Sequence, residues 1–343
     1  MCGLFKTPAY AYITARVRAR KRKLIPKETY PKLLNMQLPE IIRFIEESEY
    51  KKDVDELSAK FKSIDLLEHA LSRSLGASYR KLMDISRGEV NYLITEYMRR
   101  WDVWNIKTIL RGKYYGASEE EILNCVVSAG ELHYPELELM AKKDSIEDVI
   151  ASLEHTPYYP VLASYEGGML NKIEDGLDRL SYTRLLDAVG GSPGEKLFLK
   201  FIQTEIDIKN LKVLFRLKKA GVEREEVQNT LITGGLELKE SDLTSLSGLS
   251  FSELVHSLDG YSYWRSISDV VSDQMTTLMD VDTKLDAHLM NYASQISHYY
   301  PLSILPVLDY ILSKKTEVDN LRVIARGKEL KLADEIIRSH LVM

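Results

Sequence analysis

Apolar residues recur at helical spacing along most of the chain. In residues 89–115 they stand four or three positions apart, as Val90, Ile94, Tyr97, Trp101 and Trp104. This spacing places side chains on one face of a helix, and no proline or glycine interrupts it before Gly112. We therefore predict one long amphipathic helix over residues 89–115. Because no segment alternates apolar and polar residues as a half-buried strand does, the predicted fold class is all-α.

Glycines and capping residues predict where the helices end. Gly116 follows the long helix, and Ser118 with Glu121 forms a capping box that begins the next one. Gly221 occupies the equivalent place later in the chain. Gly234-Gly235 is predicted to close the helix after it.

Two sequence patterns each occur three times. The first begins with an acid and two apolar residues and ends with a tyrosine, over residues 40–50, 148–158 and 253–263. The second is an acid, an asparagine three positions later and then an arginine; its members are Asp102, Asn105 and Arg111, Asp207, Asn210 and Arg216, and Glu317, Asn320 and Arg326. Successive copies lie 105 to 110 residues apart, close to the size of a small domain. We therefore predict three related helical domains, residues 1–130, 131–240 and 241–343.

The repeated asparagine indicates a structural position. Asparagine inside a helix costs a few tenths of a kcal/mol relative to alanine, so its recurrence calls for a compensating contact. We expect Asn105, Asn210 and Asn320 to form that contact within their own repeat, together with the acids and arginines of the pattern. The alternative is that these residues face a partner.

Composition is that of a water-soluble globular protein. The 343 residues are 45% hydrophobic and 28% charged, and the net charge is −5. No apolar run is long enough to span a membrane, and no signal peptide begins the chain, so we expect a cytoplasmic protein that reaches membranes only through partners. Cys2 and Cys125 are too few for a disulfide framework.

No group of residues predicts catalysis. The chain lacks a phosphate-binding glycine loop and any serine or cysteine motif with a nearby histidine. Glu253-Leu-Val-His256 matches half of a di-metal motif of helical bundles, but a second copy is missing. We therefore predict no catalytic residues, no metal site and no cofactor, and hence a protein that is not an enzyme.

Seven basic residues lie between Arg16 and Lys27 with no acid among them. The apolar Ile13, Val17 and Leu24 fall on one face of this segment. The basic residues of another face are Arg16, Arg20, Lys23 and Lys27, so the segment is predicted to form an amphipathic helix that ends at Pro26. Such a helix could contact acidic lipid headgroups or a phosphate backbone, but we expect it to face solvent or a partner protein. Without interleaved aromatics or a second basic cluster, nucleic acid is not the expected partner.

The chain resembles the C subunit of archaeal-type rotary ATPases, and is similar to the d subunit of the eukaryotic vacuolar enzyme. The resemblance rests on Tyr10-Ala-Tyr-Ile-Thr-Ala-Arg16-Val-Arg18 with Lys23-Leu-Ile, on Tyr300-Pro-Leu-Ser-Ile, and on Glu317-Val-Asp-Asn320-Leu-Arg322. We expect Arg16, Arg18, Asn320 and Arg322 to be structural. The resemblance covers nearly the whole chain.

This resemblance implies a funnel of three pseudo-equivalent helical domains with quasi-threefold symmetry. It implies a non-catalytic coupler of the central stalk, peripheral to the membrane. Its partners would be the proteolipid of the membrane rotor ring and the D- and F-type subunits of the rotor shaft. The coupler would transmit torque for proton or sodium transport that accompanies ATP synthesis or hydrolysis.

Two other classes of protein fit the same residues. A general helical scaffold or adaptor would share the repeats and the lack of catalytic motifs. A helical enzyme with a site between the repeats would show a titratable cluster in only one of them. Beyond His256, the sequence carries no such asymmetry.

Overall fold

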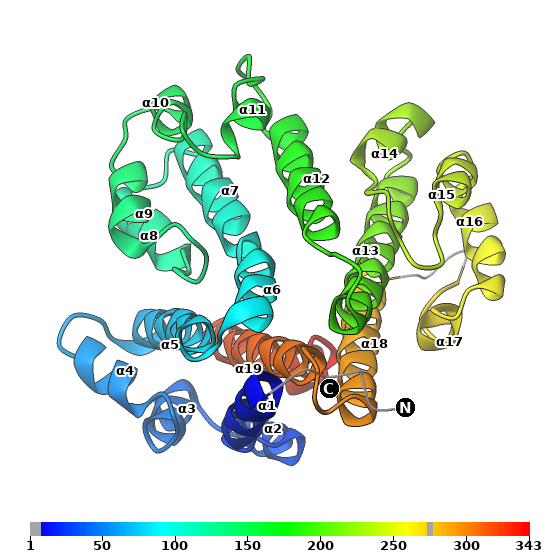
Figure 1. Cartoon of the computed structure of the whole chain (residues 1–343). Coiled ribbons are helices and arrows are strands. Elements are labelled where there is room, and N and C mark those ends of the chain that lie inside the picture. Colours follow the sequence, from blue (N-terminus) through cyan, green and yellow to red (C-terminus); the bar gives the residue numbers. More distant parts are fainter. Residues whose placement is uncertain (1–7, 273–276) are drawn as a thin grey trace. The chain divides into compact units, whose positions relative to one another are not determined.

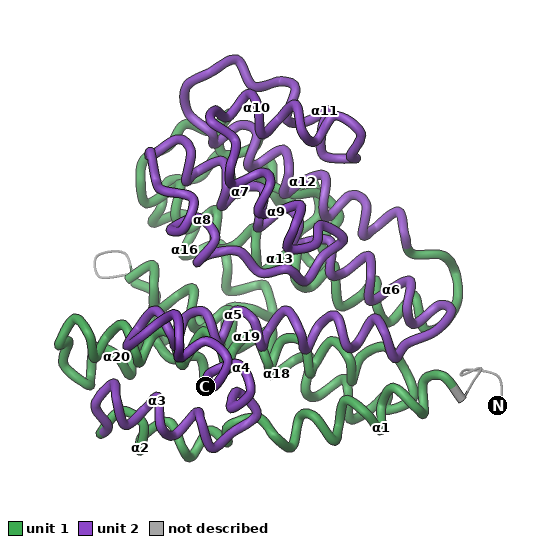
Figure 2. Tube along the Cα trace, turned by 90° about the vertical axis from the view of Figure 1, so that its left-hand side faces the viewer, with its two compact units in different colours: residues 1–35, 189–343 green, residues 36–188 purple. Residues whose placement is uncertain are grey.

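The structure is a computed structural model that describes residues 8–272 and 277–343. Within these residues the regular elements are all helices, so the all-α prediction is confirmed. Cys2 lies outside the described residues. The chain forms two compact units, residues 36–188 and residues 1–35 with 189–343, shown in separate colours in Figure 2. The division into three domains stays a prediction.

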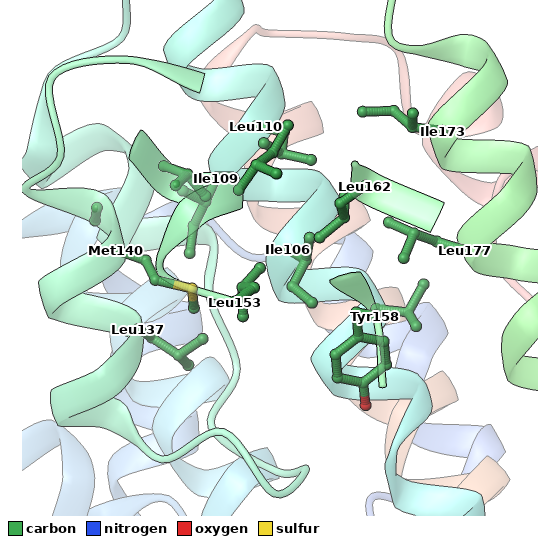
Figure 3. Close-up of a cluster of buried hydrophobic side chains, with 14 of the residues drawn as sticks. Ile106, Ile109, Leu110, Leu137, Met140, Leu153, Tyr158, Leu162, Ile173 and Leu177 are labelled. Atoms are coloured by element: carbon green, nitrogen blue, oxygen red, sulfur yellow. The ribbon is translucent and has the colours of Figure 1, made fainter. Parts of the chain in front are cut away.

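The unit of residues 36–188 contains ten helices with a shared apolar core among the described elements. Ile106, Ile109 and Leu110 of the long helix α7 contribute to a cluster of buried side chains that later helices complete (Figure 3). The helices are α3 (Leu38–Glu46), α4 (Lys51–Leu57), α5 (Ser63–Ile85), α6 (Gly88–Met98), α7 (Arg100–Tyr114), α8 (Glu119–Cys125), α9 (Tyr134–Ala141), α10 (Ile146–Ala151), α11 (Tyr159–Leu162) and α12 (Asn171–Asp187).

The second unit joins the N-terminal residues to the C-terminal half. Its longest helices pack in sequence, α13 on α18, α18 on α19 and α19 on the N-terminal helix α1 (Figure 1). Its elements are α1 (Pro8–Lys21), η1 (Lys27–Thr29), α2 (Tyr30–Leu34), α13 (Pro193–Lys219), α14 (Arg224–Thr230), α15 (Glu240–Ser247), α16 (Phe251–Ser257), η2 (Leu258–Gly260), α17 (Trp264–Ile267), α18 (Leu278–Tyr299), α19 (Leu305–Glu329) and α20 (Asp334–Ser339).

The predicted single helix over residues 89–115 is two helices, α6 and α7. At Arg99 the backbone tightens, because the N–H of Asp102 donates to the Arg99 carbonyl 3.0 Å away, a spacing of three residues. The turn changes the phase of the apolar stripe. Trp101 is buried as expected, but Trp104 is 53% exposed, and Val103 and Ile106 form the buried face of α7 instead.

The predicted helix ends are confirmed for α7, α8 and α13. Gly116 and Gly221 follow α7 and α13 with φ of +70°, and Ser118 with Glu121 forms the predicted capping box of α8. The prediction for Gly234-Gly235 was wrong, because α14 already ends at Thr230. No helix among the described residues is long and apolar enough to cross a membrane.

Candidate functional site

The acid and asparagine of the second repeated pattern lie in the long helices α7, α13 and α19, and all are buried. Four of them have no exposed surface, namely Asp102, Asn105, Asp207 and Asn210, while Glu317 exposes 3% and Asn320 2%. A buried carboxylate is stable only where hydrogen bonds replace water. The surroundings of each acid are therefore the candidate site.

Asp102 joins α7 to two segments that follow it in the sequence. Its carboxylate accepts the backbone N–H of Glu131 at 3.1 Å and that of Leu132 at 2.9 Å. The buried Tyr158, just before α11, donates its hydroxyl to the same carboxylate at 3.0 Å. Three donors converge on this one acid, and they hold the loop after α8 and the start of α11 against the long helix.

Asn105 pairs with a single residue of the loop after α8. Its side-chain amide donates to the Val127 carbonyl at 2.8 Å, and its oxygen accepts the Val127 N–H at 2.8 Å. Both groups of the amide are thus hydrogen-bonded in the interior. This pair supplies the compensation that a helical asparagine requires.

The second cluster repeats this arrangement around Asp207. The carboxylate accepts the N–H groups of residues 236, 237 and 238 at 3.0, 2.7 and 3.2 Å. Tyr263 donates its hydroxyl at 2.8 Å, again 56 residues after the acid. Asn210 forms the same two hydrogen bonds with Ile232, at 2.7 and 2.9 Å, 22 residues away as in the first cluster.

A glycine permits the close approach of the loop in both clusters. A Cβ on Gly130 would lie 2.0 Å from Oδ1 of Asp102, and a Cβ on Gly235 would lie 1.9 Å from Oδ1 of Asp207. Only a residue without a side chain fits such positions. Gly235 therefore serves the carboxylate of Asp207 and does not end a helix.

In the third cluster, the backbone N–H that reaches the acid comes from the N-terminal segment. In the first two clusters it comes from a loop that follows the long helix in the sequence. Glu317 of α19 accepts the backbone N–H of Ile25 and forms an ion pair with the fully buried Lys314 at 3.0 Å. Asn320 pairs with Val342 at 2.9 and 3.0 Å, with the same separation of 22 residues. Tyr30 is hydrogen-bonded to Asn320. Residues from both ends of the chain thus complete this cluster.

Burial dominates the electrostatics of the two aspartates. Loss of water raises the pKa of Asp102 to about 6, against the opposing effect of its three hydrogen bonds. Burial likewise raises the pKa of Asp207. Burial and, after it, the neighbouring carboxylate raise the pKa of Tyr158, so this phenol stays protonated and acts as a hydrogen-bond donor.

The repeated arginines lie outside these clusters. Arg111 forms two hydrogen bonds of 2.6 Å with Glu174 of α12, and the side chains of Arg216 and Arg326 are exposed. A lysine four residues before Arg111 forms a second ion pair with α12, between Lys107 and Asp178 at 2.9 Å. The three predicted residues of each repeat therefore separate into a buried acid–asparagine pair and an arginine on another face of the helix.

The buried clusters leave no room for substrate, because their polar atoms are already hydrogen-bonded within the fold. Among the described residues, no group of three or more histidines, cysteines or carboxylates is placed to hold a metal ion. Glu253 caps α16 by accepting the N–H of Ser250 at 2.8 Å, and His256 is exposed. The buried acid and asparagine of each cluster therefore hold segments of the fold together.

The unit of residues 36–188 also contains a cleft of about 880 Å³. His69 stacks on Phe61 in its wall, with ring centroids 3.7 Å apart. The cations of the cleft already have contacts within the unit. Arg73 forms an ion pair with Asp53 at 3.1 Å, Arg80 donates to the Ser128 carbonyl, and the ammonium group of Lys60 lies 4.9 Å from the centre of the Phe61 ring. Glutamates of α8 and α9 also line the cleft, so it has no dominant charge.

The sequence patterns did not reveal the tyrosine and the glycine of the first two clusters. Each predicted domain contains a tyrosine pattern followed by an acid–asparagine pattern, but Tyr158 and Tyr263 donate to the aspartate of the preceding copy, 56 residues earlier. The glycines did carry a signal, because Gly130 and Gly235 each stand 28 residues after the aspartate they contact. Comparing the two copies at that position would have revealed them.

Residues 13–340 match the model of a family described as ATP synthase (C/AC39) subunit. Among similar proteins, the C subunit of the A-type ATP synthase of Methanococcoides burtonii is 53% identical over 97% of this chain and 94% of its own length. The proteins of the same name from Methanosarcina mazei and Archaeoglobus fulgidus are 47% and 41% identical. These matches cover 97% and 98% of this chain, and 93% and 96% of the relatives.

Proposed function

Because the chain belongs to the ATP synthase (C/AC39) subunit family, we propose that it is the non-catalytic coupler of the central stalk of a rotary ATPase. Membership in a family of accessory subunits confirms the expectation that the chain is not itself an enzyme. The coupler links the D- and F-type subunits of the rotor shaft to the proteolipid ring. It is peripheral to the membrane on the cytoplasmic side and transmits torque for proton or sodium transport.

The recurrence of one buried cluster in three long helices is the observation that carries this proposal. A coupler must resist shear between shaft and ring, so its long elements have to be fixed to their neighbours. Asp102 and Asp207 each bind two separate segments to a long helix, and Glu317 does so with the N-terminal segment. We propose that three modules of this kind surround an axis, with quasi-threefold symmetry and a funnel shape.

Exposed apolar side chains at equivalent helix ends are candidates for contact with the partner proteins. Tyr115 after α7 is 80% exposed and Leu330 after α19 is 69% exposed, and each stands ten residues after the asparagine of its repeat. Tyrosine is among the residues enriched at protein interfaces, and both side chains occupy the same position of their repeats.

Purification of the tagged chain from detergent-solubilised membranes of its host, followed by mass spectrometry, tests the proposal. Shaft subunits and ring proteolipid should be recovered together. A Tyr115→Ser, Leu330→Ser double variant should recover several-fold less of them, whereas Tyr134→Ser, at a residue that is 48% exposed but lies at the start of α9, should match the unmodified chain. Reproducible recovery of a different complex, without shaft or ring, would refute the coupler.

A further inference from the structure

The outer face of α1 carries a concentration of positive charge, separate from the proposed contacts at Tyr115 and Leu330. Arg16, Arg18, Arg22 and Lys23, in α1 and the turn that follows it, are all exposed, and we call these four residues the basic face. Tyr12, one turn before Arg16, is 52% exposed. The nearest acid in the sequence is Glu28, so the basic face contains no negative charge of its own.

Packing of α1 directs these cations away from the rest of the unit. Tyr10, Ile13 and Val17 are 5% exposed or less, on the side where α1 packs along α19. Lys21 is on this inner side and forms an ion pair with Asp309 of α19 at 2.6 Å. In Figure 2, α1 runs along the lower edge of its unit.

The cations of the basic face have no counter-charge among the described residues. Lys21 is neutralised by Asp309, but none of the four residues forms an ion pair with any residue that the structure describes. Four like charges within eight residues repel one another, and an external layer of anions relieves that repulsion. Because the whole chain carries a net charge of −5, an anionic surface attracts this face while it repels most of the remainder.

We propose that the basic face of α1 binds the phosphates of anionic phospholipids at the membrane surface. Guanidinium groups pair with phosphate oxygens through two parallel hydrogen bonds, and clusters of four or more basic residues on a helix are typical of binding to acidic lipid. The apolar face of α1 is already buried against α19, so the helix lies on the headgroups and does not insert. Tyr12 suits the same interface, where a ring with a polar tip is favoured.

A fluid lipid layer fits this face better than an acidic protein does. The basic face is one convex helix with long, flexible side chains, and lipid headgroups can move to meet them. A folded protein would have to present carboxylates in a fixed pattern. The inference goes beyond the proposed coupling function and relies on it only for the closeness of the chain to a membrane.

Sedimentation of the full chain with lipid vesicles tests the inference directly. Vesicles of phosphatidylcholine with 30% phosphatidylglycerol should bind the chain, vesicles of phosphatidylcholine alone should not, and raising the salt from 50 to 500 mM should weaken the binding at least tenfold, as expected for charge pairing at about these ionic strengths. The test variant replaces the basic face as Arg16→Gln, Arg18→Gln, Arg22→Gln and Lys23→Gln.

A matched control removes four exposed cations elsewhere in the same unit, as Lys196→Gln, Lys200→Gln, Arg265→Gln and Arg338→Gln. The test variant should bind anionic vesicles at least tenfold more weakly, and the control should bind within about twofold of the unmodified chain, since charge near the surface sets the affinity. Circular dichroism and thermal unfolding confirm that both variants are folded.

Three results would overturn the inference: no binding of the unmodified chain to anionic vesicles, equal weakening by both variants, or binding to a polyglutamate peptide but not to vesicles. The last result would assign the face to an acidic protein. Recovery of shaft and ring with the test variant separates the two proposals, because loss of lipid binding with retained recovery leaves the coupler intact.

Discussion

Asp102 shows how much a single buried acid can influence this protein. Its ordinary pKa of 3.8 is raised to about 6 by loss of water, although three donors surround it. A raised pKa means that the folded chain holds this proton more tightly than the unfolded chain. Protonation of Asp102 therefore adds to the free energy of unfolding. This contribution is fully present below about pH 4 and is lost as the pH rises through 6.

We expect the free energy of unfolding to depend on pH because of Asp102. Between pH 4.5 and 7.5, the stability of the unmodified chain relative to an Asp102→Asn variant should fall by about 2 kcal/mol, because the variant cannot bind the proton. Urea unfolding of both proteins at the two pH values measures the change, and the comparison cancels groups that titrate in both. A constant difference would show that Asp102 does not titrate in this range.

Gly235 offers a second test at the residue scale. A methyl group at this position meets Oδ1 of Asp207 and, at 2.8 Å, the carbonyl oxygen of Leu238. Gly235→Ala should therefore lower the free energy of unfolding by about 1–3 kcal/mol. Gly260→Ala is the control, because nothing lies within 4 Å of its Cβ, and it should change stability by less than about 0.5 kcal/mol.

At the scale of elements, the three long helices end alike but with different residues. Eleven positions after the repeated asparagine stand Gly116, Gly221 and Lys331, with φ of +70°, +70° and +55°. In all three helices, the N–H of the next residue donates to a carbonyl five positions earlier. This is the Schellman arrangement that glycine favours, so Lys331 bears a steric cost that the other two avoid.

Lys331→Gly should therefore stabilise the protein. The relief of left-handed strain exceeds the entropy cost of glycine by about 0.5 kcal/mol, which thermal unfolding resolves as a small rise in Tm. Glu329→Gly, two residues earlier and still helical, should instead lower stability by about 1 kcal/mol. If both substitutions changed the stability in the same direction, the backbone conformation at Lys331 would not be the cause.

The elements were more predictable than their contacts. Helix periodicity, the glycines after α7 and α13 and the capping box of α8 are local signals, and the structure agrees with them. The turn at Arg99 was not predictable, because a stripe with spacings of three and four continues across it in the sequence. The pairing of Tyr158 with Asp102 was also hidden, since a repeated pattern has acids on both sides of each tyrosine and only folding chooses between them.

At the scale of the whole chain, Glu317 connects the first residues to the last long helix. Its carboxylate contacts the Ile25 N–H and the ammonium group of Lys314, whose side chain has no exposed surface. Glu317→Gln removes the counter-charge of a buried lysine, so we expect the free energy of unfolding to fall by about 3 kcal/mol.

Chemical unfolding of Glu317→Gln beside Asp319→Asn tests this expectation. The second substitution removes the Lys315–Asp319 ion pair, in which the two side chains are 50% and 40% exposed, and a longer pair of 3.7 Å with Arg322. It should cost less than about 1 kcal/mol. Equal losses would mean that the buried pair contributes no more than the exposed one.

Because α1 packs on α19, it cannot reach its native position during synthesis until α19 has also been made. Lys21 and Asp309 are 288 residues apart in the sequence. At a synthesis rate of about 5–20 residues per second, the ribosome adds Asp309 roughly 15 to 60 seconds after Lys21. Throughout that interval Tyr10, Ile13 and Val17 lack the helix that buries them. Helix α1 is thus made long before α19 but cannot reach its final place until α19 is made, and its apolar side must be kept from other surfaces until then.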